Sequence, residues 1–447
     1  MEQLNLIIDT YQRIILESES QLAKVKRHIY RIGTLRLILF AAVVAGIIYF
    51  WSEGRLVISG IAAITFIPFL LLVKLHNRLF RQKDYLEKKI EINRQELQAI
   101  AYYTSSFDNG KEFIDPAHLY TYDLDVFGEH SLFQYINRTA TQPGKKRLAE
   151  WMKTHLKNKA EIEKRQEAVK ELAPELEMRQ HFRILGLLHK GKTADEEEIM
   201  NWATSPEYYR KKWYFRTLAI LVPLANAVCL GLAIAGVISF TTWGIVFAGI
   251  GLLSSSFSKG VSQMQSVYGK KMQILTTYAH LIHIIEEKEM ESSALKRVKG
   301  LVGGEKQTAS QAVKRLTALM NALDQRNNML MQFVLNGLFF WELRQVMKIE
   351  TWKESFAANL PHWLEAIGEM DAYCSLATFA YNHPGYVFPE IASKPFCMEA
   401  EALGHPLMDR DKCVRNDIQI AKRPFFVIIT GANMAGKSTY LRTIGVS

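Results

Sequence analysis

A stretch of 42 residues, 217–258, contains no Asp, Glu, Lys, Arg or His, and it limits the possible folds more than any other feature. A bilayer core about 30 Å thick is crossed by about 20 apolar residues in a helix. The stretch is therefore long enough for two spans, with a polar break at Ser239, Thr241 and Thr242. The alternative interpretation, a pair of buried helices in a large soluble core, requires unusually long core helices.

Two shorter uncharged runs, 37–52 and 56–73, lie near the N-terminus and are separated only by Glu53, Gly54 and Arg55. Their 16 and 18 residues make them borderline spans joined by a tight turn. Basic residues flank both pairs of runs, whereas the turns inside each pair hold almost none. The flanking residues are Lys24, Lys26, Arg27, Arg31, Arg36, Lys74, Arg78, Arg81, Lys83, Arg210, Lys211, Lys212, Arg216, Lys259, Lys270 and Lys271. The positive-inside rule then predicts two transmembrane hairpins, 35–75 and 217–258, which make four spans, with the bulk of the chain cytoplasmic.

Composition excludes several classes of protein. With 49% hydrophobic and 22% charged residues, the chain is neither disordered nor fibrous. Its four cysteines form no CxxC pair, which fits a reducing compartment and argues against a disulfide framework. The net charge of +10 points to nucleic acid or to an anionic membrane. Because the membrane flanks hold 16 basic residues and no acidic ones, the rest of the chain carries −6, so topology accounts for the basic excess.

The remaining segments are mostly helical in pattern. Residues 1–34 form an amphipathic helix, 76–121 a helical stalk or linker, and the segments 2–34 and 82–103 are expected to pair as an antiparallel stalk. Strand patterns come late, at Asp417–Ile420 and at Phe425–Thr430.

The second of these strands leads into GANMAGKS at 431–438, which matches G-x-x-x-x-G-K-[ST] between a strand and a helix. In such a loop, backbone N–H groups and the helix N-terminus bind phosphate. The lysine contacts the β- and γ-phosphates, and the hydroxyl binds Mg²⁺. The sequence thus predicts a site for ATP or GTP with Mg²⁺, in which Ser438 is the metal ligand. The predicted nucleotide-binding residues are Gly431, Ala432, Asn433, Met434, Ala435, Gly436, Lys437, Ser438 and Thr439.

Hydrolysis needs a later strand with an acidic Mg²⁺ ligand and a group that positions water. The sequence ends nine residues after Ser438, so no catalytic residue is assigned. We expect it to be part of a longer protein, and this part alone to hold nucleotide weakly without efficient hydrolysis.

The loop TGANMAGKSTYLR resembles that of the MutS family of DNA mismatch-repair ATPases, whose pattern is close to TGPNMGGKSTYLR. Further stretches resemble the family in the same order: 131–151, 162–172, 369–377 with 386–391, and 404–407 with 416–418. The first carries the pattern N/D-R-T-x-T-x-x-G-x-R/K-x-L-x-x-W. Its positions here are Asn137, Arg138, Thr139, Thr141, Gly144, Lys146, Leu148 and Trp151.

The resemblance implies a mainly α fold. A MutS-like helical core would occupy 122–216 and 259–395, interrupted by the second hairpin, and 396–447 would begin an α/β P-loop ATPase domain. It also implies ATP and Mg²⁺ as cofactors, ATPase activity and homodimerisation through the ATPase domains of the complete protein, and ATP binding coupled to movement of the core. Mismatched or branched DNA would be the ligand.

The sequence departs from the family in places. We expect no counterpart of its N-terminal mismatch-reading domains, and we interpret the Phe-x-Glu patterns at 127–129, 340–342 and 388–390 as chance. Ala432 and Ala435 replace the family's Pro and second Gly, and the aromatic that stacks on adenine has no match at 413–415.

Two other functions remain open. One is a membrane-tethered ATPase switch acting on a protein or lipid with no DNA role, and the other is a non-catalytic scaffold, against which Lys437 and Ser438 argue. No basic stripe with interleaved aromatics supports DNA binding. Three weaker candidates remain. His280 and His283 have a spacing that could bind a metal, and His405 is a turn residue or a catalytic base. Candidate phosphate contacts are Lys145, Lys146, Lys296, Arg297 and Lys299.

Overall fold

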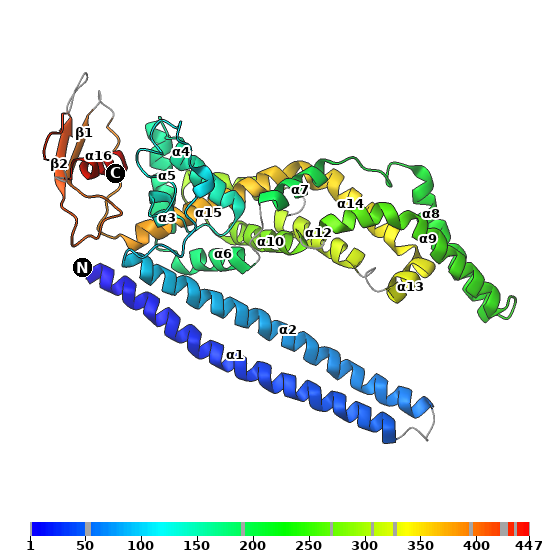
Figure 1. The fold of residues 1–447 in the computed structure, drawn as a ribbon. Helices are drawn as coiled ribbons and strands as arrows, with labels where there is room; N and C mark the ends of the chain where they lie inside the picture. The colour runs from blue at the N-terminus through cyan, green and yellow to red at the C-terminus, as the bar shows by residue number, and fades with distance from the viewer. Residues whose placement is uncertain are drawn as a thin grey trace.

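The computed structural model describes residues 2–49, 55–188, 193–268, 271–304, 308–324, 329–392, 397–420, 428–432 and 436–446. They form an elongated, mainly helical molecule with a small sheet at one end, beside which both ends of the chain lie (Figure 1). The helices are α1 Glu2–Tyr49, α2 Arg55–Ile100, α3 Leu132–Ile136, α4 Gln142–Lys153, α5 Lys159–Leu172, α6 Leu176–Leu188, α7 Thr193–Thr204, α8 Trp213–Ile234, α9 Phe240–Tyr268, α10 Lys271–Glu287, α11 Ser293–Val302, α12 Ala309–Asp324, α13 Met329–Phe339, α14 Trp341–Phe356, α15 Leu360–Asn382 and α16 Lys437–Val446. Short 3₁₀ turns occupy Lys111–Phe113 and Ala357–Asn359, and the strands are β1 Met398–Leu403 and β2 Asn416–Ile420.

Helices α1 and α2 pack antiparallel as the predicted stalk. Apolar residues on their facing sides are buried, among them Tyr11 and Ile90. Ion pairs join the outer edges, Lys26 to Glu87 at 3.0 Å and Arg94 to Glu19 at 2.5 Å. Both helices run without a break from the polar stalk into the first apolar runs, so stalk and hairpin form one continuous pair of helices.

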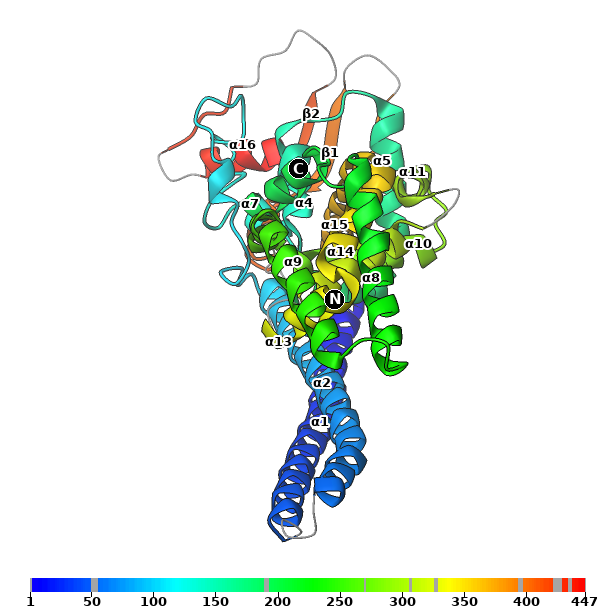
Figure 2. The same ribbon diagram turned by 90° about the vertical axis from the view of Figure 1, so that its right-hand side faces the viewer.

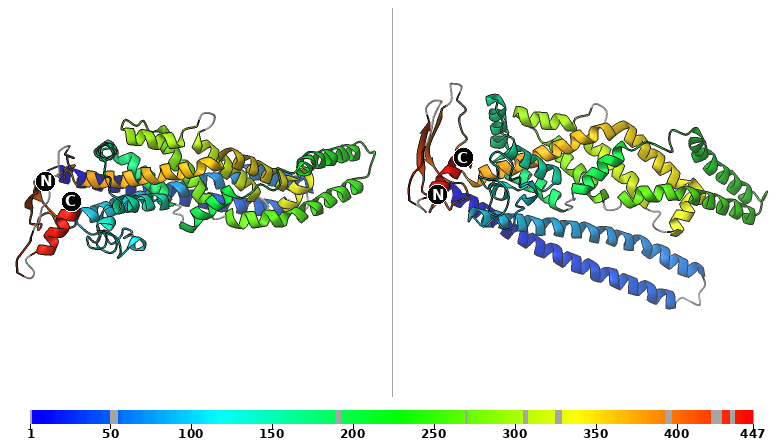
Figure 3. Two further views of the ribbon diagram at one scale, coloured as in Figure 1. Left: turned by 90° about the horizontal axis from the view of Figure 1, so that it is seen from above. Right: turned by 45° about the horizontal axis from the view of Figure 1, so that its top comes forward.

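The second long apolar stretch also folds as a helical hairpin, α8 and α9, which turns at Gly236 with φ +75°. Within the described residues, α1 and α8 are long and apolar enough to cross a membrane, and α9 contributes a shorter apolar segment, Phe240–Ser254. A buried core helix can pass the same test, but the most apolar windows of α1 and α8 are only 0% and 17% buried. Both hairpins extend toward the end of the molecule opposite the sheet (Figures 1 and 3), and they project from the core as two separate arms (Figure 2).

The helical core is built around α15, whose residues are buried along most of its length. Helices α4, α5, α6 and α11 pack directly against it, and α10, α12 and α14 extend the same hydrophobic cluster toward the second hairpin. The segments 122–216 and 259–395 therefore pack into one core, although the second hairpin separates them in sequence.

The C-terminal region holds an antiparallel pair of strands, in which Met398 pairs with Ile420 and Ala400 with Ile418. The strand predicted at Asp417–Ile420 is confirmed. Of the strand predicted at Phe425–Thr430, residues 425–427 lie outside the described residues, and 428–430 have no regular secondary structure. The described part of 396–447 is thus a two-stranded sheet with one helix, and it does not by itself establish an α/β P-loop domain.

Candidate nucleotide-binding loop and its connection to the core

The phosphate-binding loop predicted at 431–438 leads directly into α16. Asn433, Met434 and Ala435 lie outside the described residues, as does the backbone angle on which alanine at 435 depends. Gly436 has φ +80°, a conformation that favours glycine, and the helix begins at the next residue. Gly436, the glycine directly before the lysine of the motif, therefore lies where the backbone conformation favours glycine.

Lys437 and Ser438 form the start of α16. The Lys437 amino group donates to the carbonyls of Gly431 and Ala432, which holds it over the loop. Ser438 and Thr439 are exposed in the first turn. The first backbone N–H groups of a helix have no partners within it, and the helix dipole adds positive potential there. A flexible cation, a hydroxyl and unpartnered N–H groups are together a donor set that suits a phosphate and its Mg²⁺.

Helix α16 is attached to both the sheet and the core. The Tyr440 hydroxyl donates to the carbonyl of Asp417 in β2 at 3.3 Å, and Arg442 pairs with Asp125 at 2.5 Å. A Cβ on Gly445 would lie 2.5 Å from a methyl of Leu124, so α16 packs closely on the segment 120–127. A hollow of about 440 Å³ lies beside this contact and is lined by Asp115, Asp123, Asp125 and Arg442, among others. A shift of α16 would therefore act directly on this segment of the core.

The motif residues from Asn137 to Gly144 form a buried polar cluster with α15. The Asn137 side-chain oxygen accepts from the backbone N–H of Thr139 at 3.0 Å and from its hydroxyl at 2.6 Å. Thr141 caps α4 by accepting from the N–H of Gly144, and its hydroxyl donates to Asp371 at 2.7 Å. Asp371 also accepts from the backbone N–H groups of Ala140 and Thr141. The two motif stretches, 131–151 and 369–377, are thus one structural unit.

Burial raises the pKa of Asp371 to about 6, although the hydrogen bonds from Thr141 and Ala140 favour its charged form. Gly144 lies against this carboxylate so closely that a Cβ would be 2.1 Å from Oδ2. The motif glycine is therefore required by packing against Asp371. Trp151, at the end of the motif, packs on Tyr373 with ring centroids 4.8 Å apart.

Arg138 connects the motif to the stalk. Its Nε donates to Glu96 of α2 at 2.7 Å, and Arg183 of α6 donates to the same oxygen at 2.6 Å. The other Glu96 oxygen accepts from Asn382 at the end of α15 at 2.9 Å. Burial would raise the pKa of Glu96, but the two guanidinium groups outweigh it and hold that pKa below its usual value. Glu96 is thus a buried carboxylate shared by the stalk, α6 and the core.

Sequence reasoning missed the roles of Glu96 and Asp371. Asp371 lies inside the matched stretch 369–377, so its position was visible but its carboxylate's contact with Thr141 was not. Glu96 lies in a helix rich in charged residues, and nothing in the sequence distinguishes it from its exposed neighbours.

The basic residues considered as phosphate contacts are mostly occupied elsewhere. Lys145 is buried and paired with Asp108 and Glu112. Arg297 is paired with Glu369, and Lys299 donates to a backbone carbonyl. The other two candidates, Lys146 and Lys296, are exposed.

The histidine candidates have structural surroundings. His283 approaches Glu287 at 3.2 Å, and among the described residues no group of three or more His, Cys, Asp and Glu could hold a metal ion. The His405 imidazole accepts from the N–H of Leu407 at 3.3 Å, which places it in a turn. Phe127 and Phe340 of the Phe-x-Glu patterns are buried, and Phe388 packs against the core, so none is a free wedge.

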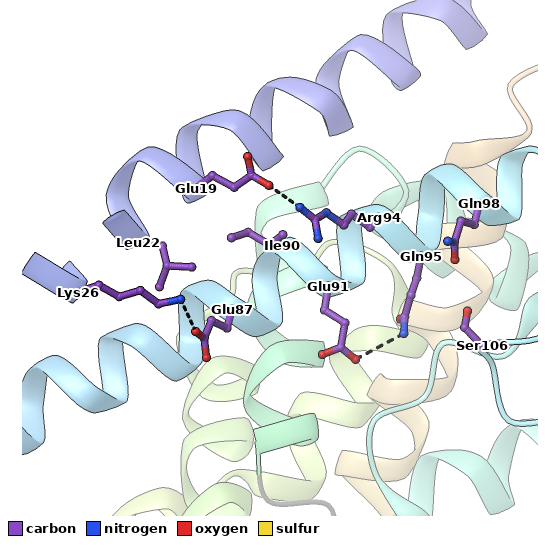
Figure 4. Close-up of a pocket in the computed structure, with 10 residues that line it drawn as sticks. All are labelled: Glu19, Leu22, Lys26, Glu87, Ile90, Glu91, Arg94, Gln95, Gln98 and Ser106. Atoms are coloured by element: carbon purple, nitrogen blue, oxygen red, sulfur yellow. Dashed lines mark hydrogen bonds and ion pairs between the residues drawn. The ribbon is translucent and has the colours of Figure 1, made fainter. Parts of the chain in front are cut away.

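A second hollow, about 470 Å³ in volume, lies along the stalk (Figure 4). Its charged walls are already paired: Lys26 with Glu87, and Arg94 with Glu19. These pairs leave little to recognise a small ligand, so the loop at 431–439 remains the candidate site.

The helical core and its motif cluster define a class of protein. A family profile described as MutS domain III matches residues 119–377, more than half of the chain. The chain belongs to the MutS family.

Individual relatives agree with this. The DNA mismatch repair protein msh3 of Aspergillus terreus is 26% identical over 385 residues, which cover 73% of this chain and 33% of that protein. The DNA mismatch repair protein MutS of Haloquadratum walsbyi is 43% identical over 107 residues, 24% of this chain and 10% of that protein. MutS of Staphylococcus saprophyticus is 30% identical over 109 residues. The chain spans about a third or less of the length of these relatives.

Proposed function

We propose that this chain is the core and phosphate-binding loop of a membrane-anchored MutS-like ATP-binding protein, in which ATP binding moves the helical core. Lys437 would contact the phosphates, Ser438 would bind Mg²⁺, and the N-terminus of α16 would stabilise the negative charge. The observation that carries the proposal is the start of α16, where Gly436 has a positive φ and Lys437 is held over its own loop.

Coupling to the core is supported by a continuous set of contacts. Arg442 of α16 pairs with Asp125, and Val126 and Phe127 pack in a buried cluster with Phe133. Four residues further on, Asn137 and Arg138 begin the motif that joins Glu96 of the stalk. Through these contacts a displacement of α16 could be transmitted to the stalk.

Membrane anchoring is supported by the two apolar hairpins. Their large apolar side chains are exposed, and burying such surface is favourable by about 25 cal/mol per Å². The two hairpins extend toward the same end of the molecule, as two elements entering one bilayer would (Figure 3).

The DNA role is proposed from the family alone. The relatives are DNA mismatch repair proteins by name, so mismatched or branched DNA is the ligand to test first. In the alternative, a membrane-tethered switch acts on a protein or lipid. The pairing of Lys145 and Arg297 with carboxylates favours this alternative, since it occupies two of the five basic candidates, although Lys146 and Lys296 are exposed. Salt-dependent retention of mismatched, branched and plain duplex separates the two, and no retention rejects the DNA role.

The test of nucleotide binding is Lys437→Ala in the detergent-solubilised chain, with Lys412→Ala, exposed in the same region, as the matched control. We expect Lys437→Ala to abolish binding of a fluorescent ATP analogue and Lys412→Ala to leave it unchanged. Spin labels on α2 and α16 should report a change in their distance on addition of ATP in the unsubstituted loop and in Lys412→Ala, and no change in Lys437→Ala. Equal affinity in the two variants would reject the assignment of the loop.

A further inference from the structure

The second hairpin does not stand free along its whole length. The short helix α13 packs against both α8 and α9, and α14 continues along the same side toward the base of α8. Near that base, Glu350 of α14 accepts from the backbone N–H groups of Tyr209 and Arg210. Nothing in the sequence pattern indicates α13 as a partner of this hairpin.

A polar layer fixes α13 to the middle of the hairpin. Asn226, fourteenth of the 22 residues of α8, is buried and donates to the carbonyl of Gly337 at 2.7 Å. Trp243 of α9 donates its indole N–H to the Asn226 oxygen at 2.8 Å. Close packing accompanies these bonds, because a Cβ on Gly337 would lie 2.4 Å from the ring of Phe247.

Charged residues lie at the same level. The chain turns at Phe340 with φ +51°, and the Asn336 side chain both accepts from the N–H of Glu342 at 2.9 Å and donates to its carboxylate at 3.2 Å. Arg344, half a turn further along α14, is exposed. A charged side chain in the centre of a bilayer costs about 3 kcal/mol or more. The hydrocarbon region therefore cannot extend from the tip past the level of Asn226 while α13 and α14 remain packed on the hairpin.

The part of the hairpin beyond Asn226 is short. From Asn226 to Ile234 the helix rises about 12 Å, and the turn adds a few ångströms more. That length matches one leaflet, about half of a 30 Å hydrocarbon core. The part is uncharged, and its outward apolar side chains are exposed. These are Val228, Leu232, Ile234, Val237 and Phe240.

The first hairpin differs. The uncharged run 56–73 of α2 rises about 26 Å, close to the full hydrocarbon thickness. In the described part of the chain α1 packs on α2, and its most apolar window is 0% buried.

We propose that the α8–α9 hairpin enters only the near leaflet of the bilayer, with the Asn226–Trp243 layer and α13 at the membrane surface, and that only α1 and α2 cross it. The inference rests on the membrane attachment proposed above and sharpens it from four spans to two. Trp243 then lies at the interface, where tryptophan is enriched. Val334 and Phe339 of α13, which are exposed, then meet the lipid head groups.

The test compares the two turns. Val237→Cys and Tyr49→Cys, both at exposed positions, are made in a Cys229→Ser background and studied in sealed right-side-out vesicles. A membrane-impermeant maleimide should label Tyr49→Cys before detergent is added and Val237→Cys only afterwards. The labelling of the Cys229→Ser protein without an added cysteine is subtracted in each case. Labelling of Val237→Cys before detergent would overturn the one-leaflet insertion, and protection of Tyr49→Cys would overturn the contrast between hairpins. Release of the protein by a carbonate wash would instead reject membrane attachment itself.

Discussion

Removing the carboxylate of Glu96 should destabilise the protein strongly, because two arginines depend on it. Arg138 and Arg183 donate to one of its oxygens at 2.7 and 2.6 Å, and both pairs are largely shielded from water. Breaking a buried pair by removing one partner costs about 3–5 kcal/mol. We expect Glu96→Ala to lower the free energy of unfolding by that amount.

The matched control is Glu91→Ala, five residues earlier on α2. Glu91 pairs with Lys88 at 2.6 Å on an exposed face, where such pairs contribute about 0.5 kcal/mol or less. Both variants of the full chain would be unfolded with urea in detergent and followed by circular dichroism. A loss for Glu96→Ala within about 1 kcal/mol of the control would refute a buried, charge-sharing joint between stalk and core.

The pH dependence gives an independent check. Since the pKa of Glu96 is lowered in the folded protein, its stabilisation is present above the unfolded value of about 4.3 and is lost as pH falls through the folded value. The stability difference between the wild type and Glu96→Gln should therefore shrink below about pH 4. A difference that is constant down to pH 3 would contradict the lowered pKa.

Two further substitutions probe the motif cluster. Gly144→Ala should lower the free energy of unfolding by about 1–3 kcal/mol, because the new methyl would overlap Asp371. Gly300→Ala, where a Cβ meets nothing within 4 Å, should stabilise the protein slightly. Urea unfolding measures both, and equal effects would contradict the close packing of Gly144. Asp371 has a pKa raised to about 6, so its contribution to stability is lost as pH rises from about 4 through 6, and Asp371→Asn should remove that slope. A variant that keeps the wild-type slope between pH 4 and 7 would assign it to another group.

Much of the fold was predictable because it follows from periodicity. The apolar stripe of residues 2–34 and its counterpart in 82–103 predicted the antiparallel stalk, since each helix has one face that must be buried. The uncharged stretch 217–258 predicted a hairpin for a similar reason, and its polar break at Ser239 coincides with the turn. These features are local, and one sequence suffices to reveal them.

The site was predictable only in part. The motif spacing placed Lys437 at the start of a helix, as the structure has it. Glu96 and Asp371 could not be assigned roles, because burial of a carboxylate depends on partners 42 and 230 residues away. The charged face of α2 gives the same pattern whether Glu96 meets water or two arginines. Likewise, α13 is apolar enough to belong to any core, and only its contacts with Asn226 and Phe247 assign it to the hairpin.

The unbroken stalk fixes the distance between the membrane and the nucleotide-binding end of the molecule. Between Glu2 and the start of the apolar run, α1 rises about 50 Å, and α16, which follows the phosphate-binding loop, lies at the end of the molecule opposite the two hairpins. Several Debye lengths then separate the loop from the lipid head groups, so the charge of the bilayer cannot tune nucleotide binding directly. Two copies in one membrane would carry their loops in a common plane. Their encounter becomes a search in two dimensions, in which density in the bilayer replaces concentration in solution as the variable that governs pairing.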